Sequence, residues 1–364
     1  MPLERGHEIL AIGVQGRRVP MPPRNLVFLV DVSGSMADRD KLPLLKSALL
    51  ELVATLGAAD RVAIVVYAGQ TDVALRPTPG SRRGEIRAAL EGLRASGATN
   101  GGEGIRLAYR VARQGFRPDG VNRVILCSDG DFNAGVTDRD KLQRLIQENR
   151  RSGVFLTVLG FGSGNLNDAT METLADRGDG NYAYVDSLTE ARKALGPGSL
   201  VTIARDVKIQ VEFEPSAVAS YRLLGYDNRA LEEGAFGNDR VDAGEAGSGQ
   251  SVTALYELVP TGRGGRPGQM SLGYKPPSGS ARARLLKAPL PERVKTFERA
   301  SENTRFACSV AAFGMVLRGS EHRGDASLER VSRWASSALG EDSHGHRREF
   351  LELVSLASSA VPSR

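Results

Sequence analysis

The sequence predicts an α/β protein: a doubly wound, mostly parallel sheet, followed by an antiparallel β domain and a C-terminal helical tail. Three observations support this order. Between about residue 25 and residue 195, short apolar runs alternate with amphipathic helical patterns. Beyond Gly198, apolar and polar residues alternate, as in strands with one face in water. From about residue 291, apolar residues recur at helical spacing.

The strands expected in the α/β region are apolar runs too short for helices. Many of their residues are β-branched, which is typical of strands covered on both faces. Pro77 and Pro79 bound one run and favour an edge position for it, because proline cannot donate to a β-ladder. The predicted strands are Leu26–Val30, Arg61–Tyr67, Thr71–Arg76, Val121–Cys127, Val154–Phe161 and Asn181–Val185.

Helices are expected between these strands. An apolar stripe from Leu42 to Leu56 lies on one helical face, and Gly57 stands where a C-cap would end that helix. Asp138 is suited to cap a later helix. Further helices are predicted at 86–93, from Thr99 toward Gly115, at 138–146, at 168–176 and at 188–195.

Alternation of apolar and polar residues marks the antiparallel domain. It is clearest in Val201–Phe213, where positions 207, 209, 211 and 213 are apolar. Ile9–Val14, near the start of the chain, has no obvious place in the parallel sheet. We therefore expect it to join the antiparallel domain, with the α/β domain inserted by sequence. The other strands of this domain are predicted at Ala219–Tyr226, Val252–Val259, Met270–Tyr274 and Ala283–Lys287.

Three amphipathic helices are expected at the end of the chain. Their apolar stripes begin at Phe306, Leu328 and Phe350. Core packing is the interpretation we adopt for them, with a partner-binding surface as the alternative. The predicted division is a strand segment at 1–20, an α/β domain at 24–195, the antiparallel domain at 199–290 and helices at 291–364.

Composition limits the possible functions. The net charge of +5 and the pI of about 9.3 raise the question of nucleic acid. Basic residues are interspersed with acids, however, and aromatic residues are only 5%, so no nucleic-acid binding is predicted. No apolar run reaches transmembrane length, and Met1–His7 has no signal-peptide apolar region, so neither membrane insertion nor an export signal is expected. Cys127 and Cys308 lack metal-ligand spacing.

Oxygen-bearing side chains follow two of the buried strands, and a further one lies in a glycine-flanked loop. The carboxyl ends of parallel strands meet at one edge of a sheet, so these side chains can converge there. Carboxylates and hydroxyls without imidazole or thiolate favour Mg²⁺, Mn²⁺ or Ca²⁺ over zinc. Mg²⁺ takes about six oxygens, which leaves room for a ligand from outside. The candidate ligands are Asp31, Ser33, Ser35, Thr99 and Asp129.

These motifs resemble the metal-ion-dependent adhesion site of von Willebrand factor type A (VWA) domains. The shared order is Asp-x-Ser-x-Ser, a threonine in a glycine-adjacent loop, and Asp-Gly after the next long strand. The resemblance covers Asn25 to about Leu195. The chain is also similar to bacterial YfbK-type proteins, through runs such as Asp40–Lys46 and Ser128–Asn133, and this likeness continues beyond Thr202.

The resemblance implies a non-enzymatic, divalent-metal-dependent protein-binding module. Ser33, Ser35 and Thr99 would supply hydroxyl ligands, and Asp31 and Asp129 would act directly or through water. An acidic side chain of a partner protein would complete the coordination of the metal. Family members often carry a secretory or lipoprotein signal, which favours the cell envelope. This chain departs from that pattern, so we expect it to be either truncated or intracellular.

Two alternative functions stay open. An intracellular VWA co-factor of an ATPase or chaperone assembly would use the same site. A metal-dependent phosphohydrolase would use Asp31 as its nucleophile. Sites of the haloacid-dehalogenase type need a second acid where Ser33 stands, and a lysine from a later motif, which is not identifiable. Gly160–Asn165 half-resembles a dinucleotide loop but lacks the rest of that fingerprint and is interpreted as a turn.

Four more polar residues have ligand chemistry. Asn100 and Asp131 flank the predicted ligands, and hydrogen bonding to those ligands is the expected role of both. His344 and His346 form an isolated His-x-His with no third ligand nearby in sequence, so a polar surface loop is expected there and not a zinc site. All four histidines lie outside the α/β region, which argues against a Ser-His-Asp arrangement.

Overall fold

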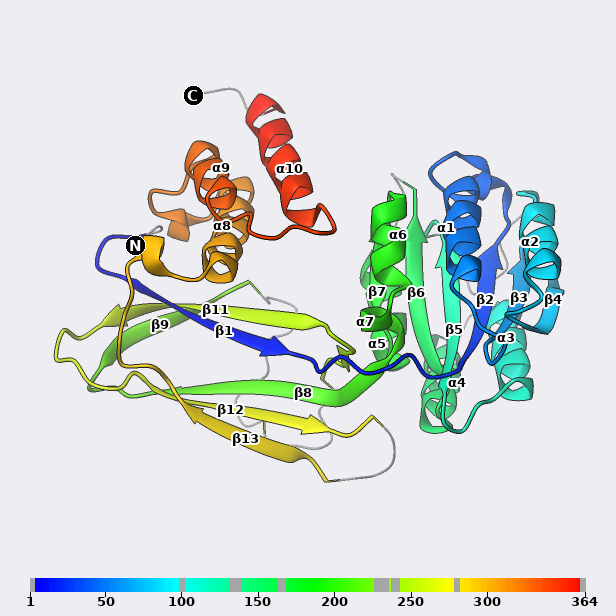
Figure 1. Ribbon diagram of the computed structural model, residues 1–364, viewed down its shortest axis with the longest axis horizontal. Helices are drawn as coiled ribbons and strands as arrows, with labels where there is room; N and C mark the ends of the chain where they lie inside the picture. The colour runs from blue at the N-terminus through cyan, green and yellow to red at the C-terminus, as the bar shows by residue number, and fades with distance from the viewer. Residues whose placement is uncertain are drawn as a thin grey trace.

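The computed structural model describes residues 4–97, 102–130, 139–162, 168–225, 236, 243–277 and 282–360. These residues form an α/β unit, two antiparallel sheets and a cluster of C-terminal helices (Figure 1). The helical cluster lies on one of the antiparallel sheets, and the α/β unit lies beside them. The predicted fold class is confirmed.

A six-stranded sheet forms the centre of the α/β unit. Its order is β4-β3-β2-β5-β6-β7, and every neighbouring pair is parallel except β3 with β4. All six strands predicted for this region are present, and β4 runs beyond the predicted end at Arg76 to Pro79. The strands are β2 (Arg24–Asp31), β3 (Arg61–Tyr67), β4 (Thr71–Pro79), β5 (Val121–Ser128), β6 (Phe155–Phe161) and β7 (Tyr182–Val185).

Helices cover both faces of this sheet, which explains why its central strands are mostly apolar and buried. The first face carries α1 (Leu42–Ala54), α2 (Arg83–Gly92), α6 (Leu188–Ala194) and α7 (Pro197–Leu200). The second face carries α3 (Gly102–Gln114), α4 (Arg139–Arg151) and α5 (Asp168–Arg177). The predicted cap Asp138 lies outside the described residues.

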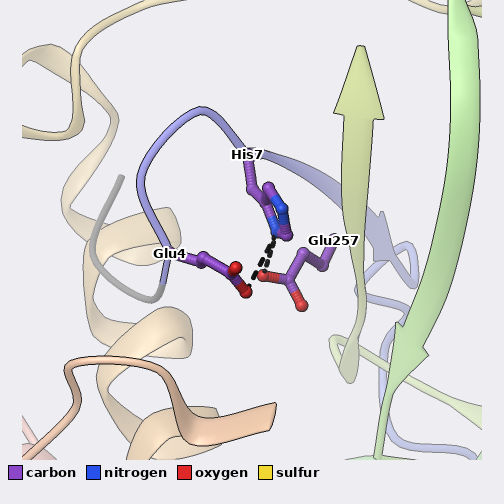
Figure 2. Close-up of side chains that lie close together, drawn as sticks. All are labelled: Glu4, His7 and Glu257. Carbon is purple, nitrogen blue, oxygen red and sulfur yellow. Dashed lines mark hydrogen bonds and ion pairs between the residues drawn. The ribbon is translucent and has the colours of Figure 1, made fainter.

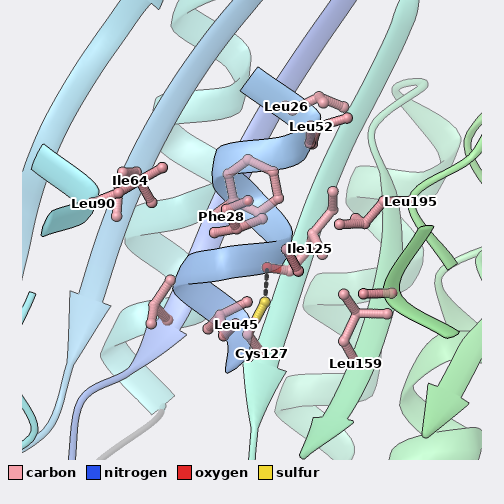
Figure 3. Packing of buried hydrophobic residues seen from close by; sticks show 14 of the residues in the cluster. Leu26, Phe28, Leu45, Leu52, Ile64, Leu90, Ile125, Cys127, Leu159 and Leu195 are labelled. Carbon is pink, nitrogen blue, oxygen red and sulfur yellow. Dashed lines mark hydrogen bonds between the residues drawn. The ribbon is translucent and has the colours of Figure 1, made fainter. Parts of the chain in front are cut away.

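The core under α1 shows how the leucine stripe is used (Figure 3). Leu45 from the helix packs with Phe28 of β2 and Ile125 of β5 in one buried cluster. Each has at most 1% of its surface exposed. Burying a side chain of this size contributes roughly 1.5–3 kcal/mol, so this cluster fixes the position of α1 over the sheet.

The order of the strands reverses at β2. The chain continues from β2 to β3 on one side, whereas β5 lies on the other side of β2. Val30 is aligned with Cys127, and Asp31 with Tyr67. Ligands of open α/β sheets bind outside the carboxyl ends of the strands where the order reverses in this way. The turns after β2 and β5 therefore share one edge.

Two antiparallel sheets make up the β region. One has the order β1-β11-β9 and the other β10-β8-β12-β13. The N-terminal strand β1 pairs with β11 along its whole length, and not with the parallel sheet. The two-residue strand β10 has no counterpart among the predicted strands. The bounds are β1 (Glu8–Gln15), β8 (Thr202–Phe213), β9 (Val218–Leu224), β10 (Ala246–Gly247), β11 (Ser251–Pro260), β12 (Gly268–Lys275) and β13 (Arg284–Pro289).

The C-terminal helices α8 (Glu302–Leu317), α9 (Leu328–Ser336) and α10 (His346–Ala360) cover the sheet that contains β1. Cys308, Ala312 and Val331 share a buried cluster with Leu224 and Leu255 of that sheet. The tail thus packs in a core, but the stripe predicted for α8 is only partly right, because Val310 and Leu317 are 42% and 53% exposed and the buried face is centred on Cys308, Ala312 and Met315. Short 3-10 turns lie at Gly34–Ala37, Phe297–Arg299 and Glu321–Arg323.

Candidate metal site

Asp31 is the last residue of β2 and is fully buried. Its Oδ1 accepts the backbone N–H of Ser33 at 2.9 Å, and its Oδ2 accepts the hydroxyl of Ser128 at 3.3 Å. Burial raises the pKa of the Asp31 carboxyl, although the hydrogen bonds from Ser33 oppose this effect. The fold therefore holds a carboxylate in a place that penalises its charge.

The two serines of the motif lie in the turn directly after β2. Ser33 is buried and Ser35 is exposed, and their Oγ atoms are 3.0 Å apart. The N–H of Gly34 donates to the carbonyl oxygen of Gly97 at 3.0 Å. This bond ties the serine turn to the loop that leads toward Thr99, although Thr99 itself lies outside the described residues.

Asp129 follows β5 and is 7% exposed. Its Oδ2 accepts a hydrogen bond from the Lys41 ammonium at 3.0 Å. Its Oδ1 is buried and has no hydrogen-bond partner in the described part of the chain. A buried acceptor without a partner costs about 1–3 kcal/mol, more if it is charged, unless a ligand satisfies it. This oxygen is therefore available for a cation.

Lys41 is the residue at this edge that the sequence interpretation missed. It lies just before α1, and its Nζ also donates to the carbonyl oxygen of Ser35 at 2.9 Å. Burial, the largest single effect, disfavours its charge, but the hydrogen bond that the ammonium donates to Asp129 and the negative charges around it together outweigh burial and raise the pKa of the ammonium. A lysine a few residues after Asp-x-Ser-x-Ser is the only signal the sequence offers, and it does not reveal the contact with Asp129.

The structure brings four of the five predicted ligands together, namely Asp31, Ser33, Ser35 and Asp129. Thr99, Asn100 and Asp131 lie outside the described residues. The donors that can be assessed are carboxylate and hydroxyl oxygens, the set that Mg²⁺, Mn²⁺ and Ca²⁺ prefer. The unpartnered Oδ1 of Asp129 fits such an ion.

The phosphohydrolase alternative can be compared with the geometry around Asp31. A lysine does lie at the site, but Lys41 stands just before α1 and does not come from a later motif, and it bonds to Asp129 and not to Asp31, the required nucleophile. Ser33 occupies the place of the second acid, and its N–H bonds back to Asp31. Neither the second acid nor a lysine bonded to Asp31 is present among the described residues at this turn.

A second cluster with ligand chemistry lies at the N-terminus (Figure 2). His7 Nδ1 is 2.9 Å from Glu257 Oε1 and 3.6 Å from Glu4 Oε2. Burial, the largest single effect, would raise the pKa of Glu257, but the hydrogen bonds and charges of Arg222 and His7 together outweigh it and lower that pKa. Because Arg222 already neutralises Glu257, this cluster holds the start of β1 against β11.

His346 is the first residue of α10 and lies near two carboxylates. Glu349 Oε2 is 3.9 Å from its Nδ1, and Glu190 of α6 also lies close. Glu190 pairs with Lys193 at 3.5 Å, and the His346 and Glu349 side chains are 37% and 44% exposed. These are weak ion pairs in water. The carboxylates therefore surround His346 and not His344, and only Glu190 is brought there by folding. His346 begins a helix, so the expected surface loop is wrong at that residue.

Two family profiles match the chain. The von Willebrand factor type A domain matches residues 25–196, and the C-terminal domain of the uncharacterized protein YfbK matches residues 198–270 and 266–360. The α/β unit with its oxygen-lined edge is therefore a VWA domain, a class that typically mediates metal-dependent protein interactions. With the second match, the chain combines a VWA domain with a YfbK C-terminal domain.

The relatives agree with this assignment. Uncharacterized protein YfbK of Escherichia coli (strain K12) is 41% identical over 364 aligned residues, covering 94% of this chain and 63% of that protein. This chain thus spans less than two thirds of that relative. Uncharacterized protein sll0103 of Synechocystis is 30% identical over 175 residues, covering 48% of this chain and 40% of that protein.

Similarity to solved structures extends across both parts of the chain. A von Willebrand factor type A protein from Catenulispora acidiphila has a TM-score of 0.52 at 18% identity, covering 95% of this chain and 86% of that chain. The similarity shows a shared fold. No helix in the described part of the chain is long and apolar enough to span a membrane.

Proposed function

We propose that this protein is a divalent-metal-dependent protein-binding module. Asp31, Ser33, Ser35, Thr99 and Asp129 would hold the metal, which we take to be Mg²⁺, with Mn²⁺ or Ca²⁺ as substitutes. The metal would supply an open coordination position for an acidic side chain of a partner protein. The observation that carries this proposal is the buried Oδ1 of Asp129, which has no partner among the described residues and lies at the same edge as Asp31.

Calorimetric titration with Mg²⁺ and Mn²⁺ tests the metal site. We expect one site in the wild type and none in Asp31→Ala or Asp129→Ala. Asp119→Ala is the matched control, because Asp119 is an exposed carboxylate beyond α3, outside the candidate site. Equal binding by the wild type and both site variants would contradict the proposal.

A pull-down with and without chelator tests the partner. Partner capture that requires the metal and disappears in Asp129→Ala supports recognition through the metal. Capture that persists in chelator would place the interaction elsewhere on the chain.

We also propose that the site binds and does not catalyse. Ser33 in place of a second acid and the pairing of Lys41 with Asp129 support this. With p-nitrophenyl phosphate and Mg²⁺, we expect no hydrolysis above background. Activity that is lost in Asp31→Ala would revive the phosphohydrolase alternative.

The family resemblance favours the cell envelope as the place of action. Fractionation of the native cells, followed by immunodetection, tests this location. Recovery in the cytosolic fraction, together with an ATPase or chaperone, would support the alternative of an intracellular VWA co-factor.

A further inference from the structure

We propose that Lys41 is a built-in cation of the metal site that weakens binding of the metal itself and makes the loaded site select an anionic ligand. This inference rests on the proposed metal-dependent function and deepens it. Lys41 belongs to none of the predicted ligand positions. Its role follows from where its side chain lies.

The Lys41 side chain is held along its whole length. Its stem crosses Gly162 at the end of β6, so closely that a Cβ added to Gly162 would lie 2.4 Å from Lys41 Cε. Its ammonium donates to the carbonyl oxygen of Ser35 and to Oδ2 of Asp129. Only 16% of the side chain is exposed. The positive charge is therefore fixed at the site and does not move freely in solvent.

Lys41 bonds to only one of the two carboxylate oxygens of Asp129. Oδ2 accepts from the ammonium at 3.0 Å, whereas Oδ1 is buried without a partner in the described residues. A metal bound at Oδ1 would therefore share one carboxylate with the ammonium. Because the two cations lie on the same carboxylate, they repel each other through a medium from which water is partly excluded.

The charge balance gives the functional consequence. Asp31 and Asp129 contribute two negative charges, and Lys41 reduces the net charge of the site to −1. A divalent ion then brings it to +1, whereas it would bring a site without Lys41 to zero. Asp38 lies 3.7 Å from Lys41 Nζ, but its side chain is 73% exposed and its charge is screened. The loaded site is thus left with an unneutralised positive charge, which an incoming carboxylate would neutralise.

A purely structural role for Lys41 makes the opposite prediction. If Lys41 only positioned Asp129, its removal would loosen that carboxylate and weaken metal binding. If its charge opposes the metal, removal tightens metal binding and weakens the anionic ligand. The sign of the change in metal affinity separates these roles.

The test is calorimetry of the full chain with Mn²⁺ alone, and then with Mn²⁺ in the presence of acetate. We expect Lys41→Met to bind Mn²⁺ at least about tenfold more tightly, because one unit charge about 5 Å from a divalent ion has an effect of this size in bulk water and a larger one where water is partly excluded. Acetate should enhance Mn²⁺ binding less in Lys41→Met than in the wild type. Lys41→Arg, which keeps the charge, should stay within about twofold of the wild type.

Lys46→Met is the matched control, because it removes the same charge from α1, the helix that Lys41 precedes. Its Nζ donates to the carbonyl oxygens of Glu91 and Leu93 at 2.9 Å and 3.3 Å, away from the metal site. We expect its Mn²⁺ affinity to equal that of the wild type. Circular dichroism and thermal melting check that each variant folds. If Lys41→Met does not fold, Lys41→Gln removes the charge while keeping a hydrogen-bond donor.

Three results would overturn the inference. Unchanged or weaker Mn²⁺ binding by the neutral variants, with normal binding by the wild type, overturns the role of Lys41 and leaves the proposed function intact. Equal tightening in Lys46→Met reduces the effect to the overall charge of the chain. Absence of Mn²⁺ binding by the wild type overturns the proposed function and this inference with it.

Discussion

The Asp31 carboxylate is fully buried, and its hydrogen bonds offset only part of the free-energy cost of burying its charge. Ser33 and Ser128 donate to it, yet burial still raises its pKa. A carboxyl whose folded pKa is raised above its unfolded value prefers to be protonated in the folded state. Its ionised form therefore destabilises the fold above that pKa, and this penalty disappears as the pH falls below the unfolded value of about 3.9.

Asp31→Asn tests whether the buried charge of Asp31 destabilises the fold. We expect the variant to melt at a higher temperature than the wild type at pH 7 in chelator, because it removes a buried charge and keeps an oxygen that can accept the Ser33 N–H. The gain should shrink toward pH 3.5, where Asp31 is protonated in both states. Thermal melting at the two pH values measures it. A lower melting temperature at pH 7 would show that the Asp31 charge stabilises the fold.

Helix α3 approaches the sheet more closely than a side chain at Gly104 would allow. A Cβ added there would lie 3.1 Å from Leu29 Cδ1 and 3.1 Å from Tyr67 Cβ. Leu29 belongs to β2 and Tyr67 to β3, the two strands that lead to the site. The closeness of α3 therefore fixes where its N-terminal end, next to the loop that carries Thr99, meets the sheet.

Two glycine substitutions separate this close contact from helix propensity. Gly104→Ala should lower the free energy of unfolding by about 1–3 kcal/mol, because α3 or its neighbours must shift. Gly314→Ala, in the interior of α8 with no atom within 4 Å of the added Cβ, should raise it by roughly 0.5–1 kcal/mol. Urea unfolding of both variants measures the difference. A gain in stability from Gly104→Ala would show that the sheet accommodates a methyl group at this position without strain.

At the scale of the whole molecule, the VWA domain and the β region are joined by polar contacts as well as by the chain. Asp179, in the connection between α5 and β7, pairs with Arg150 of α4 at 2.8 Å and with Arg205 of β8 at 3.5 Å. Arg123 of β5 donates to the hydroxyl of Thr202 at 3.3 Å, and burial lowers the pKa of its guanidinium to about 10. These contacts couple the two parts near Thr202, where β8 begins.

Asp179→Asn tests this junction without changing the backbone preference. Asp179 has a φ of 48°, a left-handed conformation that asparagine also tolerates. We expect the variant to lose about 2 kcal/mol of unfolding free energy, between the values for exposed and buried pairs. The amides of 202–205 should also exchange hydrogen faster. Glu292→Gln is the control, because its pair with Arg266 is 54% and 56% exposed and should contribute little. Unchanged exchange at 202–205 in Asp179→Asn would show that the pair does not couple the parts.

We propose the division of the chain into a strand segment at 1–20, a VWA domain at 24–195, a β domain at 199–290 and helices at 291–364. The pairing of β1 with β11 supports the first assignment, and the buried cluster shared by α8 and α9 with β9 and β11 joins the last two parts. The sequence predicted the strands of the parallel sheet because double burial leaves a strong apolar signal. It did not predict the two-residue β10, whose pairing with β8 comes from its neighbours and not from its own residues.

The sequence by itself determined the class of fold and the local part of the site. Asp31, Ser33 and Ser35 are close in sequence, so the spacing of the motif alone brings them into one turn. Only the tertiary structure decided that Lys41 reaches Asp129, 88 residues away, and that one oxygen of Asp129 stays unpartnered in the described residues. Such contacts depend on the order of the strands and on the packing of α1 over the sheet, which no local pattern encodes.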